Sequence, residues 1–383
     1  YYRGRFFNYP LEPFNALVNL GILESFRILG SYFSIQLKPL PKEDTFEEWV
    51  INRFGRRLYQ TFFKTYTEKV WGIPCSKIQA DWAAQRIKGL SLMAAIREAF
   101  FGDKDVKTLI NEFHYPVLGP GMMWQHVTRQ IEDRGGQVFL NNAVVRLNCQ
   151  EDRIDSLIVR SGAEDKVYRV ENVISTMPLI DLIRSMDPKI SHEILDAANQ
   201  LQYRAFILVG LILDNQNLFP DQWIYIHSPG VRVGRIQNFK NWSSEMVAEP
   251  DITSVGLEYF CSEGDDLWVM EDRDLLELAR KELKLLGLAG SANVKNGVVI
   301  RQPKAYPVYD AKYRESLNLI QGFLSGIQNL QTIGRNGMHR YNNQDHSMLT
   351  GILAARNLMG ESHDLWKVNT ERSYYEQFTT ESE

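Results

Sequence analysis

The segment 334–349 constrains the fold more than any other stretch of this chain. The residues just before it, 330–333, predict a short buried strand, and apolar residues after it recur at helical spacing until Gly360. Asn342 and Asn343 stand where a helix N-cap belongs. A strand, a glycine turn and a polar helix N-terminus form a site for an anion or an electron-rich ring, because free N–H groups and the positive helix end favour negative charge. We therefore expect a functional site here, although a cap alone would also explain the two asparagines.

The same segment resembles the C-terminal flavin-contacting segment of the FAD enzymes that include the amine oxidases, protoporphyrinogen oxidase and UDP-galactopyranose mutase. Eukaryotic-type mutases have a Gly-Arg, an aromatic residue six positions after that arginine, and then Asn-Gln-Asp-His-Ser. Here the arginine is Arg335, the aromatic residue is Tyr341 and the block is 343–347, although the link between the last two is shorter than in those mutases. The resemblance implies FAD as the cofactor. The residues that it places against the flavin are Gly334, Asn343, Gln344 and Ser347.

The composition is that of an ordinary globular chain, with 44% hydrophobic and 23% charged residues. Its 383 residues are enough for two domains. The net charge is −4 and the Lys and Arg residues are spread along the chain, so the sequence shows neither a basic cluster typical of nucleic-acid binding nor a polybasic membrane segment. No apolar run reaches the roughly eighteen residues of a membrane span. Cys75, Cys149 and Cys261 are far apart, which argues against a zinc site and for a reducing compartment. We expect a cytoplasmic protein with a small-molecule substrate, no metal and no nucleic-acid partner.

No Gly-x-Gly-x-x-Gly motif occurs in the sequence, and the chain opens with Tyr1 rather than Met. An FAD enzyme of the resembled family begins with a strand, that glycine loop and a helix that holds the pyrophosphate. We therefore expect an N-terminally incomplete member that lacks roughly the 30-residue βαβ unit. A non-catalytic fragment that folds without holding FAD stays open as an alternative.

The expected fold is α/β with α+β parts. A Rossmann-like FAD-binding domain, incomplete at its N-terminus, would interleave with a mixed-sheet substrate domain and a helical region. The predicted ranges are 1–112 for the helical region, 113–188 for the second part of the FAD-binding domain, 189–312 for the sheet domain, and 313–383 for the C-terminal part of the FAD-binding domain.

Apolar periodicity predicts the individual elements. Helices are expected over 11–35, 46–71, 77–89, 91–101, 122–134, 272–286, 316–328 and after 343. Strands are expected over 137–147, 154–159, 166–169, 170–176, 206–213, 223–227, 232–237, 253–259, 294–301 and 330–333. The second helix should begin at a capping box formed by Thr45 and Glu48, and 305–309 should be an extended turn.

Tyrosines and arginines occur at intervals that match the mutases. Trp223-Ile224-Tyr225 is followed by Arg235, twelve residues after the tryptophan. By resemblance, Arg235 and Arg335 grip the substrate diphosphate, since guanidinium groups bind phosphate oxygens in bidentate fashion. The other substrate-binding residues that the resemblance implies are Trp71, Trp223, Tyr225, Tyr306 and Tyr341.

The resemblance assigns further contacts to FAD. Val144 would contact the adenine side through its backbone, and Thr176 and Met177 would end a strand near the same cofactor. Arg86 would lie beside the reactive edge of the flavin. The catalytic residues stay unknown. Thr67 departs from the mutase pattern, which has an asparagine there on the nucleotide side.

Two enzymatic interpretations stay open. The first is a mutase-like isomerase that acts on a nucleotide sugar through the reduced flavin with no net redox change. The second is an oxidoreductase of the amine oxidase or protoporphyrinogen oxidase type, which would need an apolar or aromatic cage. An isolated tyrosine or arginine more often packs against the fold than binds a ligand, and Trp71 taken alone would be a core residue.

Overall fold

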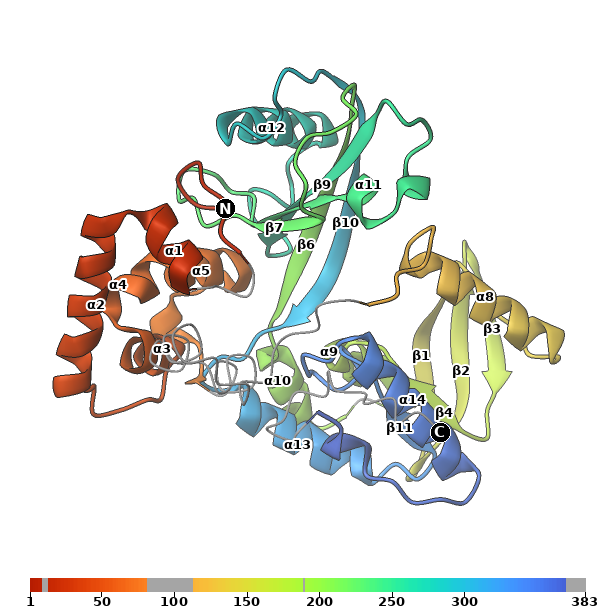
Figure 1. Ribbon diagram of the computed structural model, residues 1–383. Coiled ribbons are helices and arrows are strands. Elements are labelled where there is room, and N and C mark those ends of the chain that lie inside the picture. The colour runs from red at the N-terminus through yellow and green to blue at the C-terminus, as the bar shows by residue number, and fades with distance from the viewer. Residues whose placement is uncertain (9–12, 81–112, 189, 370–383) are drawn as a thin grey trace, which may run out of the picture. The chain divides into compact units, whose positions relative to one another are not determined.

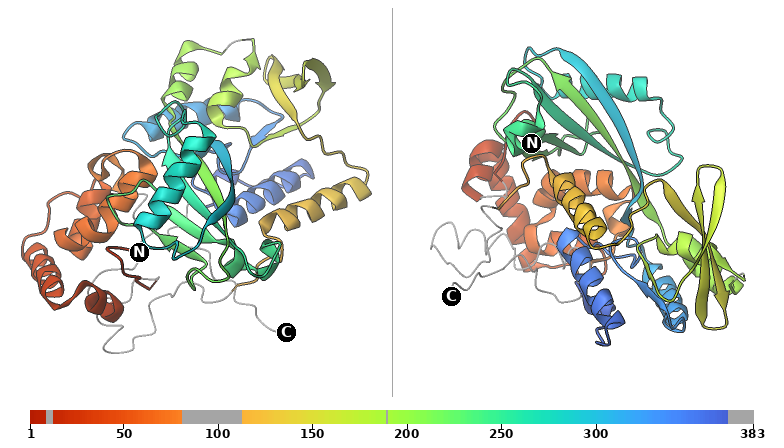
Figure 2. Two further views of the ribbon diagram at one scale, coloured as in Figure 1. Left: turned by 90° about the horizontal axis from the view of Figure 1, so that it is seen from above. Right: turned by 90° about the vertical axis from the view of Figure 1, so that its right-hand side faces the viewer.

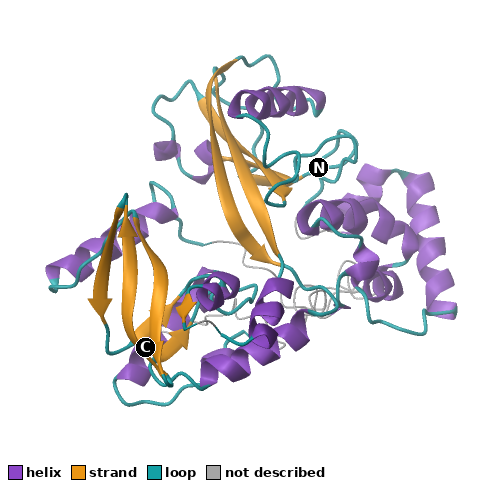
Figure 3. Ribbon diagram, turned by 180° about the vertical axis from the view of Figure 1, so that it is seen from behind, coloured by secondary structure: helices purple, strands orange, loops and turns teal. Residues whose placement is uncertain are grey.

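The computed structural model describes residues 1–8, 13–80, 113–188 and 190–369, which belong to two compact units (Figure 1). Unit 1 contains residues 1–126 and 204–303, and unit 2 contains residues 127–203 and 304–372. The chain passes between the units more than once, and both contain helices and strands (Figure 3). The predicted α/β fold with α+β parts is confirmed. The finer domain boundaries stay predictions.

The N-terminal part of unit 1 is helical, as expected. Its elements are α1 (Pro13–Leu20), α2 (Ile22–Leu37), α3 (Phe46–Phe54), α4 (Arg56–Leu58), a π-helical segment (Tyr59–Lys64), α5 (Thr65–Trp71) and a 3₁₀ turn (Cys75–Lys77). Two of the predicted helices are interrupted by glycines with positive φ, Gly21 at 87° and Gly55 at 81°. Gly55 also allows a close approach, because a Cβ there would lie 2.9 Å from the backbone of Tyr32. The predicted helices 77–89 and 91–101 fall largely or wholly in 81–112, outside the described residues.

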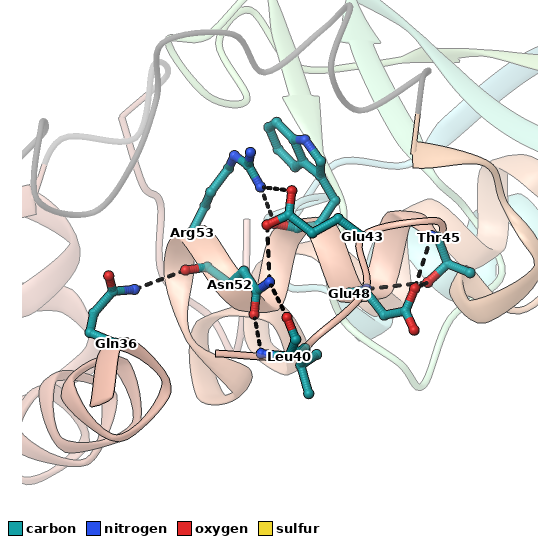
Figure 4. Close-up of polar contacts among 8 residues, drawn as sticks. Gln36, Leu40, Glu43, Thr45, Glu48, Asn52 and Arg53 are labelled. Carbon is teal, nitrogen blue, oxygen red and sulfur yellow. Dashed lines mark hydrogen bonds and ion pairs between the residues drawn. The ribbon is translucent and has the colours of Figure 1, made fainter. Parts of the chain in front are cut away.

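The predicted capping box opens α3. The Thr45 side chain accepts from the Glu48 N–H at 3.3 Å, and the Glu48 carboxylate accepts from the Thr45 N–H at 3.1 Å (Figure 4). Asn52 ties the preceding loop to the helix through the backbone of Leu40 and the carboxylate of Glu43. The local sequence therefore fixes where this helix starts.

The rest of unit 1 is a five-stranded sheet in the order β10-β6-β9-β8-β7. Its elements are β6 (Tyr203–Leu213), β7 (Trp223–Tyr225), β8 (Arg235–Asn238), α11 (Phe239–Trp242), a 3₁₀ turn (Ser244–Met246), β9 (Thr253–Cys261), α12 (Asp272–Leu285) and β10 (Val294–Pro307). Helix α12 covers one face of this sheet (Figure 2), and its buried Leu275, Ala279 and Leu283 share a core with Val209 and Leu257 of the strands.

Unit 2 is built on two smaller sheets. One has the order β3-β2-β1-β5, and the other pairs β11 with β4. The elements from 120 to 200 are α8 (Pro120–Asp133), which begins in unit 1, β1 (Asn142–Gln150), β2 (Arg153–Ser161), β3 (Glu164–Arg169), β4 (Val173–Ser175), α9 (Leu179–Arg184), β5 (Met186–Asp187) and α10 (His192–Gln200). The later elements are α13 (Tyr313–Ser325), β11 (Leu330–Thr332), α14 (Gln344–Leu358) and a 3₁₀ turn (Leu365–Lys367).

Several predicted strand or turn boundaries differ from the structure, and three of them affect the parts of the chain discussed below. The strand expected at 137–147 runs from Asn142 to Gln150, after a loop that ends at Asn141 with φ 57°. The strand expected over 170–176 is only Val173–Ser175. The turn expected at 305–309 begins as strand, because β10 continues to Pro307.

Candidate functional site

The predicted strand, glycine turn and helix are present in unit 2. β11 pairs in parallel with β4, so the carboxyl ends of both strands meet at one edge. The Ile333 N–H donates to the Ser175 carbonyl at 3.0 Å just past the strands. A Cβ added at Gly334 would lie 4.0 Å from the Thr176 methyl group. The structure therefore brings together two of the predicted cofactor residues, Thr176 and Gly334.

The turn between β11 and α14 is fixed by backbone and side-chain contacts. Gly334 adopts φ 81°, its N–H donates to the Thr350 hydroxyl at 3.1 Å, and its carbonyl accepts from the Asn342 side chain at 3.0 Å. Gly337 has no room for a side chain, because a Cβ would lie 2.8 Å from the Ser175 carbonyl. Both glycines bring bare backbone to the ends of the strands.

The N-terminus of α14 follows at once. Asn343 is its N-cap and forms a capping box with His346, whose Nδ1 lies 3.3 Å from the Asn343 nitrogen. Gln344 is exposed in the first turn, and Ser347 is half-buried one turn later. First-turn N–H groups have no partner within their own helix and lie at its positive end. The predicted cofactor residues Asn343, Gln344 and Ser347 thus share an end suited to an electron-rich ring, whereas Val144 lies in β1, in the other sheet of this unit.

Arg335 lies beside this helix end and next to a stacked pair of tyrosines. The rings of Tyr306 and Tyr341 stack with centroids 5.7 Å apart, and the Arg335 guanidinium carbon lies 5.2 Å from one centroid and 4.7 Å from the other. Its Nε donates to the Asn342 carbonyl at 2.8 Å, and its Nη1 donates to the Ala305 carbonyl at 3.3 Å. No carboxylate pairs with Arg335 within the described residues. Three predicted substrate residues therefore form one cluster, and its positive charge is not neutralised by a described acidic group.

Residues that the sequence did not single out support this cluster. The Tyr309 hydroxyl accepts from the Tyr341 N–H at 2.6 Å. His339 is buried with φ 43°, lies 3.3 Å through Nε2 from the Val308 carbonyl, and packs its ring edge-on against Tyr203. Burial lowers the pKa of His339 to about 4, so the ring is neutral near pH 7. The sequence offered little indication that His339 is a buried supporting residue, because a histidine in a glycine-rich turn could equally lie on the surface.

The other predicted arginine, Arg235, lies in unit 1 on β8. Its Nε donates to the carboxylate of Glu258 on the adjacent strand β9, and Gln237 donates to the same carboxylate. The side chains of Arg235 and Glu258 are 14% and 2% exposed, so the pair is buried. Glu258 could have been found as the charged residue in an otherwise apolar strand.

An aromatic row leads away from Arg235, whose guanidinium carbon lies 5.3 Å from the Trp223 ring centroid. Trp223 stacks on Tyr225 at 5.2 Å, and Tyr225 meets Tyr66 edge-on at 5.0 Å. On the other side, Trp223 lies 6.5 Å from Trp242. The structure therefore groups the predicted residues Trp223, Tyr225 and Arg235.

Lys69 holds the loop that joins the two strands of this group. Its ammonium donates to the carbonyls of Ile226, Ser228 and Val233 at 3.3, 2.8 and 3.1 Å. Burial lowers the pKa of Lys69 to about 8. This lysine positions the ends of β7 and β8, from which Tyr225 and Arg235 project.

Two predicted site residues are not part of these clusters: one is buried in the core, and the other lies outside the described residues. Trp71, at the end of α5, is 2% exposed and is thus part of the core of unit 1. Arg86 lies outside the described residues. Among the residues that the structure describes, no group of three or more His, Cys, Asp or Glu side chains is arranged to hold a metal ion, and no helix is long and apolar enough to cross a membrane.

Three solved structures of other proteins have a similar fold. The crystal structure of reduced UDP-galactopyranose mutase superposes with a TM-score of 0.77 at 20% identity, covering 92% of this chain and 78% of that chain. A protein assigned as a protoporphyrinogen oxidase from Exiguobacterium sp. 255-15 gives a TM-score of 0.62 at 14% identity, covering 88% and 73%. An oxidoreductase from Methanosarcina mazei gives 0.58 at 13% identity, covering 89% and 74%.

The sequence itself carries the family assignment. Residues 30–359 match the model of the flavin containing amine oxidoreductases, which spans most of the chain. This range includes the glycine turn, the N-terminus of α14 and both predicted arginines. The chain therefore belongs to the family of flavin-containing amine oxidoreductases.

Proposed function

We propose that this protein is an FAD-dependent enzyme that acts on a nucleotide-diphosphate sugar in the manner of UDP-galactopyranose mutase. The observation that carries the proposal is the cluster of Arg335 with the stacked Tyr306 and Tyr341, next to the N-terminus of α14. A guanidinium that has no described acidic partner and lies beside two phenols is suited to phosphate oxygens, because it offers charged donors next to neutral ones.

The edge formed by β4, β11 and α14 fits a flavin. Gly334 and Gly337 leave bare backbone at the strand ends, and the positive end of α14 would stabilise negative charge on a reduced ring. In this proposal Gly334, Asn343, Gln344 and Ser347 hold the ring, and Thr176 and Val144 lie toward the rest of FAD. A bound flavin supplies the redox-active ring; the protein supplies binding, orientation and charge.

The two arginines differ in whether an acidic side chain already neutralises their charge. Arg335 has no described carboxylate partner, whereas Arg235 is already paired with Glu258. We propose that Arg335 supplies most of the net attraction for a diphosphate. The substrate contacts expected from the sequence for Arg235, Trp223, Tyr225 and Trp71, and the flavin contact expected for Arg86, stay predictions.

A second candidate is an oxidoreductase of the amine oxidase or protoporphyrinogen oxidase type. The aromatic row that includes Trp223, Tyr225 and Trp242 favours it, since an apolar substrate would stack on such rings. The two candidates differ in a measurable property. An oxidase substrate bleaches the flavin under anaerobic conditions, whereas a UDP-sugar perturbs the spectrum without changing its oxidation state.

The proposal is tested by titrating UDP-galactose and UDP into the reduced, FAD-loaded protein and following flavin fluorescence. A charge-assisted hydrogen bond contributes about 1.5–3 kcal/mol, so Arg335→Ala should raise the dissociation constant roughly ten- to a hundred-fold. Arg356→Ala is the matched control, because Arg356 is exposed near the opposite end of α14. Equal affinity in the wild type and Arg335→Ala would remove the diphosphate site and favour the oxidase candidate.

A further inference from the structure

Helix α2 exposes a continuous apolar stripe. Ile22, Phe26, Phe33 and Leu37 are 79%, 69%, 54% and 89% exposed, and their spacing of four, seven and four residues places them on one helix face. The residues that α2 buries against the protein are Ser25, Ile28 and Tyr32. The stripe, defined as Ile22, Phe26, Phe33 and Leu37, is therefore the outer face of a helix that is already packed on its inner face.

The exposed apolar surface extends beyond the four residues of the stripe. Leu23 on α2 and Val18 on α1 are also exposed, at 68% and 58%. Helix α2 lies at the outer edge of the helical region of unit 1, with α3, α4 and α5 to one side of it (Figures 1 and 3). A contiguous exposed apolar face of this kind marks an interaction surface.

Positive charge gathers at the N-terminal end of the stripe. A cavity of about 610 Å³ is lined there by Arg3, Arg5, Arg27 and Arg57. Glu24 is the one carboxylate among the described lining residues, and it pairs with Arg57 at 2.5 Å and with Arg27 at 3.5 Å. Arg3 and Arg5 make no ion pair within the described residues, so the cavity keeps a positive surplus.

The cavity and the stripe are continuous, because Ile22 and Leu23 line the cavity as well as exposing their side chains. Apolar side chains bordered by arginines match an anionic bilayer surface, where acyl chains meet a layer of phosphates. A soluble apolar partner would match the stripe but would leave the arginines of the cavity without a counter-charge.

We propose that α2 is a membrane-surface helix. Ile22, Phe26, Phe33 and Leu37 would lie in the acyl boundary of an anionic phospholipid layer, and the cavity with Arg3, Arg5 and Arg27 would take a lipid phosphate. The contact is peripheral, because the inner face of α2 remains packed on unit 1. The inference is independent of the proposed catalytic function.

Sedimentation of the full-length protein with vesicles tests the proposal. The wild type should sediment with phosphatidylcholine vesicles that contain phosphatidylglycerol, and binding should weaken with added salt and with phosphatidylcholine alone. The double variant Phe26→Glu, Phe33→Glu should lower the partition coefficient by at least about tenfold. Leu285→Glu is the matched control, since Leu285 is 67% exposed on α12 and should leave binding unchanged.

A conservative variant reads out insertion directly. In Phe26→Trp the added indole fluorescence should be quenched by vesicles with brominated acyl chains, whereas the wild type should lose less of its signal. Arg3→Ala with Arg5→Ala should reduce the preference for anionic over neutral vesicles, and Arg273→Ala on α12 should not. The proposal is overturned if the wild type does not bind anionic vesicles or if the Phe26, Phe33 variant binds equally. It is also overturned if that variant instead abolishes a dimer, because a second copy would then cover the stripe.

Discussion

The Arg235 guanidinium on β8 donates to the carboxylate of Glu258 on β9, and both side chains are almost inaccessible to solvent. The two residues are direct partners across the strands in the register of the sheet. A buried ion pair of this kind matters most when one partner is lost, because the other charge is then left in a poorly solvated site.

Arg235→Ala is therefore expected to lower the free energy of unfolding by about 3 kcal/mol. Urea denaturation followed by circular dichroism measures this change. Removing both charges in Arg235→Ala, Glu258→Ala should cost less than Arg235→Ala alone, because no carboxylate remains unpaired. A double variant less stable than the single one would show that Gln237 and solvent already satisfy Glu258.

His339 predicts a pH dependence of stability in unit 2. Its pKa is lowered from 6.5 to about 4 by burial, so between these values the unfolded chain binds a proton that the folded chain does not. The free energy of unfolding should thus fall as the pH drops from 6.5 toward 4, by up to about 3 kcal/mol, and this contribution should be constant above pH 6.5.

The measurement compares urea denaturation at several pH values for the wild type and His339→Asn. Asparagine does not titrate and tolerates the φ of 43° at this position. The variant should be less stable at neutral pH because it loses the ring contact with Tyr203, yet its stability should depend less steeply on pH. Some slope should remain, since burial also lowers the pKa of His227 to about 3. If the free energy of unfolding changed equally with pH in the wild type and in His339→Asn, the folded state would not lower the pKa of His339.

Thr45→Ala should remove the capping box of α3. Loss of an N-cap hydroxyl costs about 1 kcal/mol, because the Glu48 N–H loses its acceptor. Thr45→Ser keeps the acceptor and serves as the control in the same thermal or urea unfolding measurement. If Thr45→Ala and Thr45→Ser lost the same amount of stability, the effect would come from the threonine methyl group rather than from the cap.

The sequence correctly predicted the elements that are determined by nearby residues, such as N-caps and apolar runs. The capping box at Thr45, the helix that begins after Asn343 and the apolar strand 253–259 all fold as predicted, because each is determined by residues within a few positions. The breaks at Gly21 and Gly55 were not predicted, since a glycine is tolerated in a helix and only the positive φ values of 87° and 81° mark them.

The candidate site could be predicted only in part. The order and interval of Arg335, Tyr341 and the block 343–347 indicated a flavin-family site, and the structure groups Arg335 with Tyr306 and Tyr341. The sequence could not show that Glu258 neutralises Arg235, because partners across strands depend on register. It also could not show the basic cavity beside α2, since Arg3, Arg27 and Arg57 are far apart along the chain and only the fold gathers them.

The most direct test of the account is FAD binding at the N-terminus of α14. Gln344 is exposed in the first turn of this helix, and Met359 is 83% exposed at its opposite end. A tryptophan at either position should leave the fold intact, but only Gln344→Trp should block the proposed flavin position. Met359→Trp is therefore the matched control.

The measurement is the visible absorbance and FAD affinity of the purified full-length protein. We expect stoichiometric FAD in the wild type and in Met359→Trp. In Gln344→Trp we expect FAD binding to be at least roughly tenfold weaker, which corresponds to about 1.4 kcal/mol. A wild type that purifies colourless and does not take up added FAD, or a Gln344→Trp variant that binds FAD as tightly as the wild type, would contradict the proposed cofactor site.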